Sequence, residues 1–139
     1  MSVEYLLLLV VIMVVFGYMI TNFIGPSIDA SNDISDVSAA SNAVNSIANA
    51  ANIVYTNGPN SKRTLTIYIP NDNMTVITGR NGSVGFVSMN VTLADGTIKT
   101  VSAKTDYPLF SHTYTLSKGA RGAVIKWYNG DAAINEWIG

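Results

Sequence analysis

Apolar positions are most concentrated at the start of the chain. Residues 5–24 carry no charge, and only Gly17, Thr21 and Asn22 interrupt their apolar character. At about 1.5 Å per residue this run reaches about 30 Å, the thickness of the hydrocarbon core of a bilayer. It is too long for a strand, so it predicts a helix despite its content of valine and isoleucine.

A second helical pattern follows the first after a break at Gly25-Pro26. Proline lacks an amide donor and disfavours helix in the residue before it, so this pair predicts a kink, a local melt or a restart with Pro26 as the first residue of a second helix. Farther on, apolar residues recur at alternating intervals of three and four, which is typical of one face of a helix. They are Val37, Ala40, Val44, Ile47, Ala51 and Val54. Many are small, so a sheet or another helix could approach this face closely.

Asn57-Gly58-Pro59 predicts the end of this helix, and beyond it the apolar positions alternate. In residues 64–69, Leu65, Ile67 and Ile69 alternate with polar residues and Tyr68. We expect roughly six to eight short antiparallel strands. The predicted strands are 64–69, 74–78, 84–93, 97–103, 113–116, 123–128 and 132–138, with residues 119–122 in a loop.

These patterns predict an α+β fold arranged like a lollipop, with a small C-terminal antiparallel β domain wrapped on the second half of a long N-terminal helix. Residues 1–56 form the helix, of which 1–25 are apolar and 26–56 amphipathic, and residues 59–139 form the β domain. We expect Trp127, Tyr128 and Trp137 to fill the core of this domain. Their rings could instead form a contact between subunits or a carbohydrate-binding surface.

Composition narrows the function classes. Only 12% of residues are charged, against about 25% in ordinary soluble domains, and a net charge of −1 gives no sign of a nucleic-acid partner. The chain has no cysteine, and its single histidine, His112, does not belong to a metal-ligand pattern. Glycine-rich phosphate loops and serine-elbow motifs are absent. We therefore expect neither an enzyme nor a cofactor.

Glu4 stands directly before the apolar run and is the sharpest single clue. A carboxylate at this position could remain in water and complement the positive end of the helix dipole. It could also become buried among neighbouring copies of the helix and pair with the N-terminal amine of one of them. The first basic residue is Lys62, so the basic flank of an ordinary membrane anchor is missing. We expect that a basic leader has been removed.

The first residues, Met1-Ser2-Val3-Glu4 followed by Tyr5-Leu6-Leu7-Leu8, resemble the mature N-terminus of archaeal type IV adhesion pilins, the class III signal peptide family. In that family a glutamine begins the mature chain and the glutamate is fifth; here Glu4 is fourth, which places one further residue before Met1. The resemblance covers about the first 25 residues and implies a structural subunit that polymerises into a helical filament.

The resemblance also implies which partners the chain meets during export and assembly. A prepilin peptidase removes the leader, the precursor waits in the cytoplasmic membrane, and a pilus assembly ATPase and platform protein build an extracellular homopolymer for surface adhesion. Gly25 and Pro26 are then a kink that lets the helix bend or stretch during packing. The residues expected in polymerisation are Glu4, Tyr5, Leu6, Leu9, Val10, Met13, Phe16, Ile20 and Ile24.

Three N-glycosylation sequons lie close together, at Asn73, Asn81 and Asn90. The same residue types also populate hairpin turns, which is the plainer explanation of each sequon alone. Three in a short stretch indicate N-linked glycans and a domain that faces the cell exterior. Asn73 and Asn81 fall in predicted turns, whereas Asn90 falls in a predicted strand.

Two alternatives remain beside the pilus. An archaellum filament subunit has the same layout, but the N-termini of that family typically run Gly-Ile-Gly-Thr, without an early glutamate. A monomeric single-pass anchored ectodomain that binds a ligand needs a basic flank beside its anchor, and Ser2-Val3-Glu4 supplies none.

Overall fold

The computed structural model describes residues 2–139, so Met1, the first residue of the N-terminal motif, lies outside the described residues. A long N-terminal helix is followed by a small antiparallel β domain of two sheets, which confirms the predicted α+β fold. The chain divides into two compact units between Ile34 and Ser35.

The first unit is helical from Val3 onward. Helix α1 (Val3–Met19) passes into a π-helical segment, η1 (Ile20–Ile24), and this into helix α2 (Gly25–Asn57). The interruption predicted at Gly25-Pro26 therefore takes the form of a widened turn directly before this pair. Pro26 has no amide to donate, and the Gly25 amide bonds to the carbonyl of Ile20, five residues back.

Polar side chains satisfy backbone carbonyls on both sides of the widened turn. The hydroxyl of Thr21 donates to the carbonyl of Gly17 at 3.0 Å, and the amide of Asn22 donates to that of Tyr18 at 2.9 Å. Beyond the segment, the hydroxyl of Ser27 donates to the carbonyl of Phe23 at 2.8 Å. The polar residues of the apolar run thus bond within their own helix, as an apolar environment requires.

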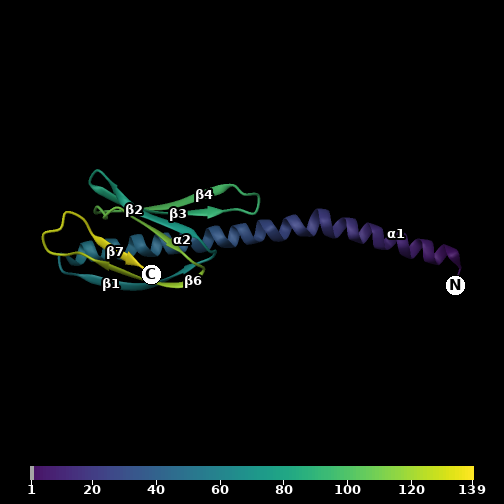
Figure 1. The fold of residues 1–139 in the computed structure, drawn as a ribbon, viewed down its shortest axis with the longest axis horizontal. Helices are drawn as coiled ribbons and strands as arrows, with labels where there is room; N and C mark the ends of the chain where they lie inside the picture. The colour runs from purple at the N-terminus through teal and green to yellow at the C-terminus, as the bar shows by residue number, and fades with distance from the viewer. Residues whose placement is uncertain (1) are drawn as a thin grey trace. The chain divides into compact units, whose positions relative to one another are not determined.

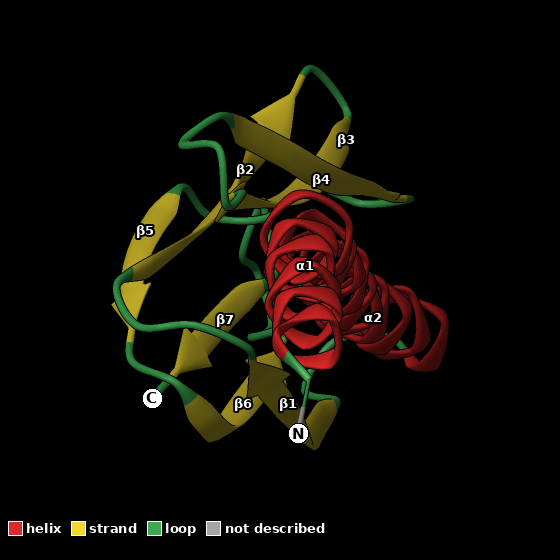
Figure 2. Ribbon diagram, turned by 90° about the vertical axis from the view of Figure 1, so that its right-hand side faces the viewer, coloured by secondary structure: helices red, strands yellow, loops and turns green. Residues whose placement is uncertain are grey.

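In the second unit, two sheets lie on opposite sides of the C-terminal half of α2 (Figures 1 and 2). One sheet has the order β1-β6-β7 and the other the order β4-β3-β2-β5. All strand pairs within them are antiparallel. The strands are β1 (Lys62–Ile69), β2 (Met74–Asn81), β3 (Val84–Thr92), β4 (Ile98–Thr105), β5 (His112–Leu116), β6 (Gly119–Lys126) and β7 (Asn135–Ile138).

The predicted helical stripe forms the centre of this unit. Ala40, Val44, Ile47, Ala51 and Val54 are all buried in one cluster with the inward-facing residues of both sheets, and Val37 packs at its margin. Each fully buried valine or isoleucine contributes about 1.5–3 kcal/mol. The alanines between them leave room for two sheets to approach one helix.

The helix ends where it was predicted to end. Asn57 is the last residue of α2, and Gly58 follows in the left-handed region with a φ of 89°. Glycine adopts this conformation without the steric penalty of a side chain. The side chain of Ser61 then donates to the carbonyl of Val54 at 2.7 Å and ties the turn to the last turn of the helix.

Several details of the predicted β domain were wrong. Residues 119–122 belong to strand β6 and not to a loop, because residues 66–69 of β1 pair with them. Asn81 ends strand β2 and does not lie in a turn, because residues 79–81 pair with residues 84–86 of β3. Strand β7 is shorter than residues 132–138. A last detail concerns the aromatic residues.

Trp137 and Tyr128 do not fill the core. Trp137 is 59% exposed because the inward positions of its strand are Glu136 and Ile138. Tyr128 is exposed as well. Trp127 alone packs as expected: it is half-buried at the margin of the core, and its ring centroid lies 4.8 Å from that of Tyr107.

Candidate self-association surface

The apolar helix is exposed along its described residues. No residue of Val3–Met19 or Ile20–Ile24 is buried. All the residues predicted to take part in polymerisation are exposed, from Glu4 and Tyr5 to Ile24, and so are Gly25 and Pro26. Exposed apolar surface on this scale marks a contact with membrane or protein. By length and composition the helix could also span a membrane.

Glu4 lies in the first turn of α1, where the helix dipole favours a negative charge. A shallow hollow beside it is lined by Glu4, by the apolar residue before it and by apolar residues one and two turns farther along. They are Val3, Leu7, Leu8, Val11 and Ile12. A second helix lying along this stripe would pass the carboxylate.

Most of the predicted polymerisation residues other than Glu4 lie on a different stripe of the same helix. Leu6, Leu9, Val10 and Met13 follow the helical spacing but do not line the hollow beside Glu4. Both stripes are apolar and exposed. The helix therefore offers apolar contact surface on more than one side, which a subunit with several neighbours requires.

The structure separates the three sequons by their surroundings. Asn73 is exposed in the turn before β2, with a φ of 57°, and Asn81 is exposed at the end of β2. Asn90 is half-buried in the central strand β3, and its side-chain oxygen accepts a hydrogen bond from the hydroxyl of Thr100 at 2.8 Å. Asn73 and Asn81 are therefore the more accessible acceptors.

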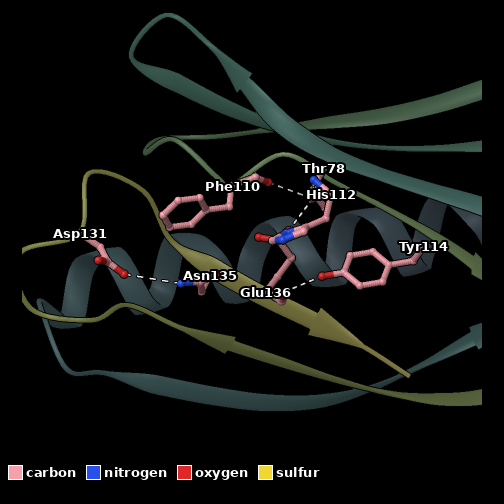
Figure 3. A network of polar contacts seen from close by, with 7 residues as sticks. All are labelled: Thr78, Phe110, His112, Tyr114, Asp131, Asn135 and Glu136. Atoms are coloured by element: carbon pink, nitrogen blue, oxygen red, sulfur yellow. Dashed lines mark hydrogen bonds and ion pairs between the residues drawn. The ribbon is translucent and has the colours of Figure 1, made fainter.

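A second polar feature lies between the two sheets, and sequence reasoning missed it. Glu136 of β7 points inward, and its side chain is completely buried. Its Oε1 accepts a hydrogen bond from the Thr78 hydroxyl at 2.5 Å and lies 2.9 Å from Nδ1 of His112 (Figure 3). The Tyr114 hydroxyl donates to the backbone carbonyl of Glu136 at 2.6 Å. These contacts tie β7 to β2 and β5, which belong to the other sheet.

Burial governs the proton equilibria of this network. Burial raises the pKa of Glu136, and the hydrogen bonds from Thr78 and His112 oppose the rise without cancelling it. Burial, with a smaller contribution from the charge of Glu136, raises the pKa of Tyr114 to about 12. Among the described residues, Oε2 of Glu136 is a buried side-chain oxygen without a partner. His112 is partly open to solvent, with its side chain 44% exposed.

Comparison with known proteins gives no relative: the chain matches no protein-family model, no curated protein and no solved structure. The likeness to archaeal pilins therefore rests on the N-terminal residues and on the layout of the elements.

Proposed function

We propose that this chain is the structural subunit of an extracellular archaeal type IV adhesion pilus, and that it polymerises through its N-terminal helix. The observation that supports this most strongly is the fully exposed apolar surface of α1 and η1. Water disfavours such a surface, so it must lie in lipid or against other protein. Lipid covers it in the precursor, and copies of the same helix cover it in the filament.

The two apolar stripes of the helix account for growth into a filament in this proposal. The stripe beside Glu4 and the stripe through Leu9 and Met13 are different surfaces of one helix. A contact between two different patches is heterologous, and repeated addition gives a helical filament where its rotation does not close into a ring. An assembly ATPase and platform protein move the subunit out of the membrane after a prepilin peptidase has removed the leader.

In this proposal Glu4 sets the position of each incoming subunit relative to its neighbour. As the incoming helix leaves the lipid, its carboxylate pairs with the N-terminal amine of a neighbouring subunit. A carboxylate inside an apolar filament core is tolerated only with such a partner. The β domains then form the outer surface, where glycans at Asn73 and Asn81 face the surroundings.

Substitution of Glu4 tests the proposal. We expect Glu4→Gln to lower the yield of filaments sheared from cells by about tenfold or more, because the charge pair in the core is lost. The amount of subunit in the membrane should stay unchanged. Asp29→Asn is the matched control, since it neutralises another exposed carboxylate of the same long helix outside the apolar run. Filaments are counted by electron microscopy and the subunit is quantified by immunoblot.

Mass spectrometry of the sheared material gives the second test. The N-terminal peptide should start at or one residue before Met1, and sugar should be found on Asn73 and Asn81 more often than on Asn90. If the unsubstituted chain is found only in membranes, with an uncleaved leader, the filament proposal fails. The anchored ectodomain then becomes the better account.

A further inference from the structure

A groove of about 580 Å³ opens beside β7, the edge strand of one sheet, and reaches β5, the edge strand of the other. Strands β6 and β7 supply one wall through side chains on the outer face of their sheet, and β5 supplies His112. Six side chains determine its chemistry: Lys62, His112, Lys126, Tyr128, Asn135 and Trp137.

Exposed aromatic rings form the apolar part of the groove. Trp137 lies on the outer face of β7, opposite Val124 of β6, and most of its surface is open to water. Tyr128 lies two residues after the end of β6 and is also exposed. Rings of this size are rigid and amphipathic, so they give large contact area at little conformational cost. A flat ligand with an apolar C–H face, such as a pyranose ring, can stack on them.

The charged part of the groove is basic. Lys62 and Lys126 are direct register partners on β1 and β6, so their side chains share one face of the sheet. Nζ of Lys126 lies 4.2 Å from the centroid of the Tyr128 ring. Within residues 2–139 neither lysine forms an ion pair. Two adjacent ammonium groups in a chain with a net charge of −1 favour an anionic ligand.

The carboxylate of Glu136 does not neutralise these lysines. Its side chain is completely buried, and its Oε1 is held by Thr78 and His112. Tyr114, one of two tyrosines of the lining, directs its hydroxyl to the Glu136 carbonyl. The Asp131 carboxylate accepts a hydrogen bond from the side-chain amide of Asn135 at 3.5 Å but does not line the groove, so the lining itself carries positive charge.

Hydrogen-bonding groups complete the site. Because Nδ1 of His112 lies against Glu136, the ring is fixed and its Nε2 remains available to a ligand. Asn135 is the register partner of Lys126 and adds an amide oxygen on the same face. Stacking rings, paired lysines and fixed polar groups around one groove are the elements that recognise a charged sugar.

We propose that this groove binds an acidic saccharide, with a sugar ring stacked on Trp137 and its carboxylate at Lys62 and Lys126. The inference deepens the adhesion proposed above and rests on it only for the setting in which the ligand is met. A neutral sugar can use the aromatic rings but leaves both lysines without a partner. The charge of the ligand is therefore part of the proposal.

Calorimetry on the full chain in detergent micelles tests this inference without filament assembly. The probe is trigalacturonic acid, and its methyl ester is the neutral control. We expect saturable binding of the acid that weakens as salt is raised, and much weaker binding of the ester. Trp137→Ala should weaken binding by about tenfold or more, because the stacking surface is removed. Lys126→Gln should weaken it and also reduce its dependence on salt.

Matched variants separate the groove from general surface effects. Tyr68→Ala removes a ring that is 53% exposed on the same sheet outside the groove, and Lys104→Gln removes a charge on β4. Both should leave binding unchanged, and circular dichroism should show every variant folded. The inference is overturned if the acid does not bind, if the ester binds equally well, or if Tyr68→Ala weakens binding as much as Trp137→Ala.

The result of the binding experiment does not depend on whether the chain forms filaments. A subunit that assembles normally but does not bind the acid retains the pilus proposal and loses the groove. A subunit that binds the acid but never assembles keeps the groove and loses the pilus.

Discussion

Glu136 places a carboxyl group between two sheets in a core that is otherwise mainly apolar. A buried carboxylate without a full set of partners is costly, and Oε2 has none among the described residues. The protonated carboxyl relieves this cost, which agrees in direction with the raised pKa of Glu136. Thr78 and His112 hold the group in place, so β7 joins the second sheet through polar contacts.

Stability should consequently depend on pH through this residue. The folded chain retains the Glu136 proton above the ordinary value of 4.5, whereas the unfolded chain loses it there. The contribution of Glu136 to the free energy of unfolding is therefore complete below about pH 4.5. It is lost as the pH rises through the raised pKa, at up to about 1.4 kcal/mol per pH unit. Glu136→Gln, which stays neutral, should flatten this fall. Urea unfolding of the full chain in micelles measures it.

Asp95 provides a control of opposite sign. Hydrogen bonds from Thr97 lower the pKa of Asp95, so the contribution of this exposed carboxyl to the stability of the folded chain is complete above about pH 3.8 and is lost as the pH falls through the lowered pKa. Asp95→Asn should therefore leave the fall caused by Glu136 above pH 4.5 in place. An unchanged pH profile in Glu136→Gln would contradict the assignment.

At the scale of elements, the sequence predicted the features that depend on the periodicity of apolar residues. The stripe from Val37 to Val54 was recognisable because its spacing persists over several helical turns, and the core bears it out. Strand β7 was harder, because Trp137 and Glu136 alternate and hydrophobicity alone favours the tryptophan inside. Two isoleucines, Ile134 and Ile138, share the face of Glu136 and are buried with it. Their combined burial decides which face points inward.

The groove could not be predicted from spacing. Its residues come from β1, β5, β6, β7 and the loop after β6, and only the pairing of β1 with β6 and of β6 with β7 brings Lys62, Lys126 and Asn135 onto one face. The π segment was foreseen only as a break. Proline indicates that a bond is missing, but not that the preceding turn widens to supply another.

Pro26→Ala should convert this break into regular helix. The new amide can reach the carbonyl of Asn22, so η1 is no longer needed to bypass it. We expect the backbone amides of residues 20–27 to exchange hydrogen more slowly by a factor of about ten or more. A proline inside a helix costs about 3 kcal/mol, and a tenfold change in rate corresponds to about 1.4 kcal/mol. Hydrogen exchange with mass spectrometry on the full chain in micelles gives the rates.

Ser27→Ala is the companion variant for this segment. It keeps the proline but removes the hydrogen bond from Ser27 to the carbonyl of Phe23, so exchange should stay the same or become faster. If Pro26→Ala exchanges as fast as the unsubstituted chain, the proline is not the cause of the π segment. In cells, loss of filaments in Pro26→Ala would show that assembly uses this weak point.

At the scale of the whole molecule, exposed apolar residues occur in two settings that a single chain cannot distinguish. Met13 on α1 is 68% exposed and Ile98 on β4 is 66% exposed. Met13 belongs to an apolar surface that surrounds its helix, whereas lysine and threonine neighbour Ile98 along its strand. Only the first setting requires a covering of lipid or protein.

Substitution of Met13 and of Ile98 by lysine distinguishes these two settings. Met13→Lys places a charge in the middle of the apolar run, where it costs about 2.5–3.5 kcal/mol in a bilayer and meets no partner in a filament core. We expect filaments to be lost in Met13→Lys and retained in Ile98→Lys, as measured by electron microscopy of sheared material. The membrane fraction then identifies the step affected: subunit that is present but unassembled indicates failed packing, and subunit that is absent indicates failed insertion. Filaments of normal yield in Met13→Lys would mean that this helix is not buried in the assembly, and self-association would have to be sought on the β domain.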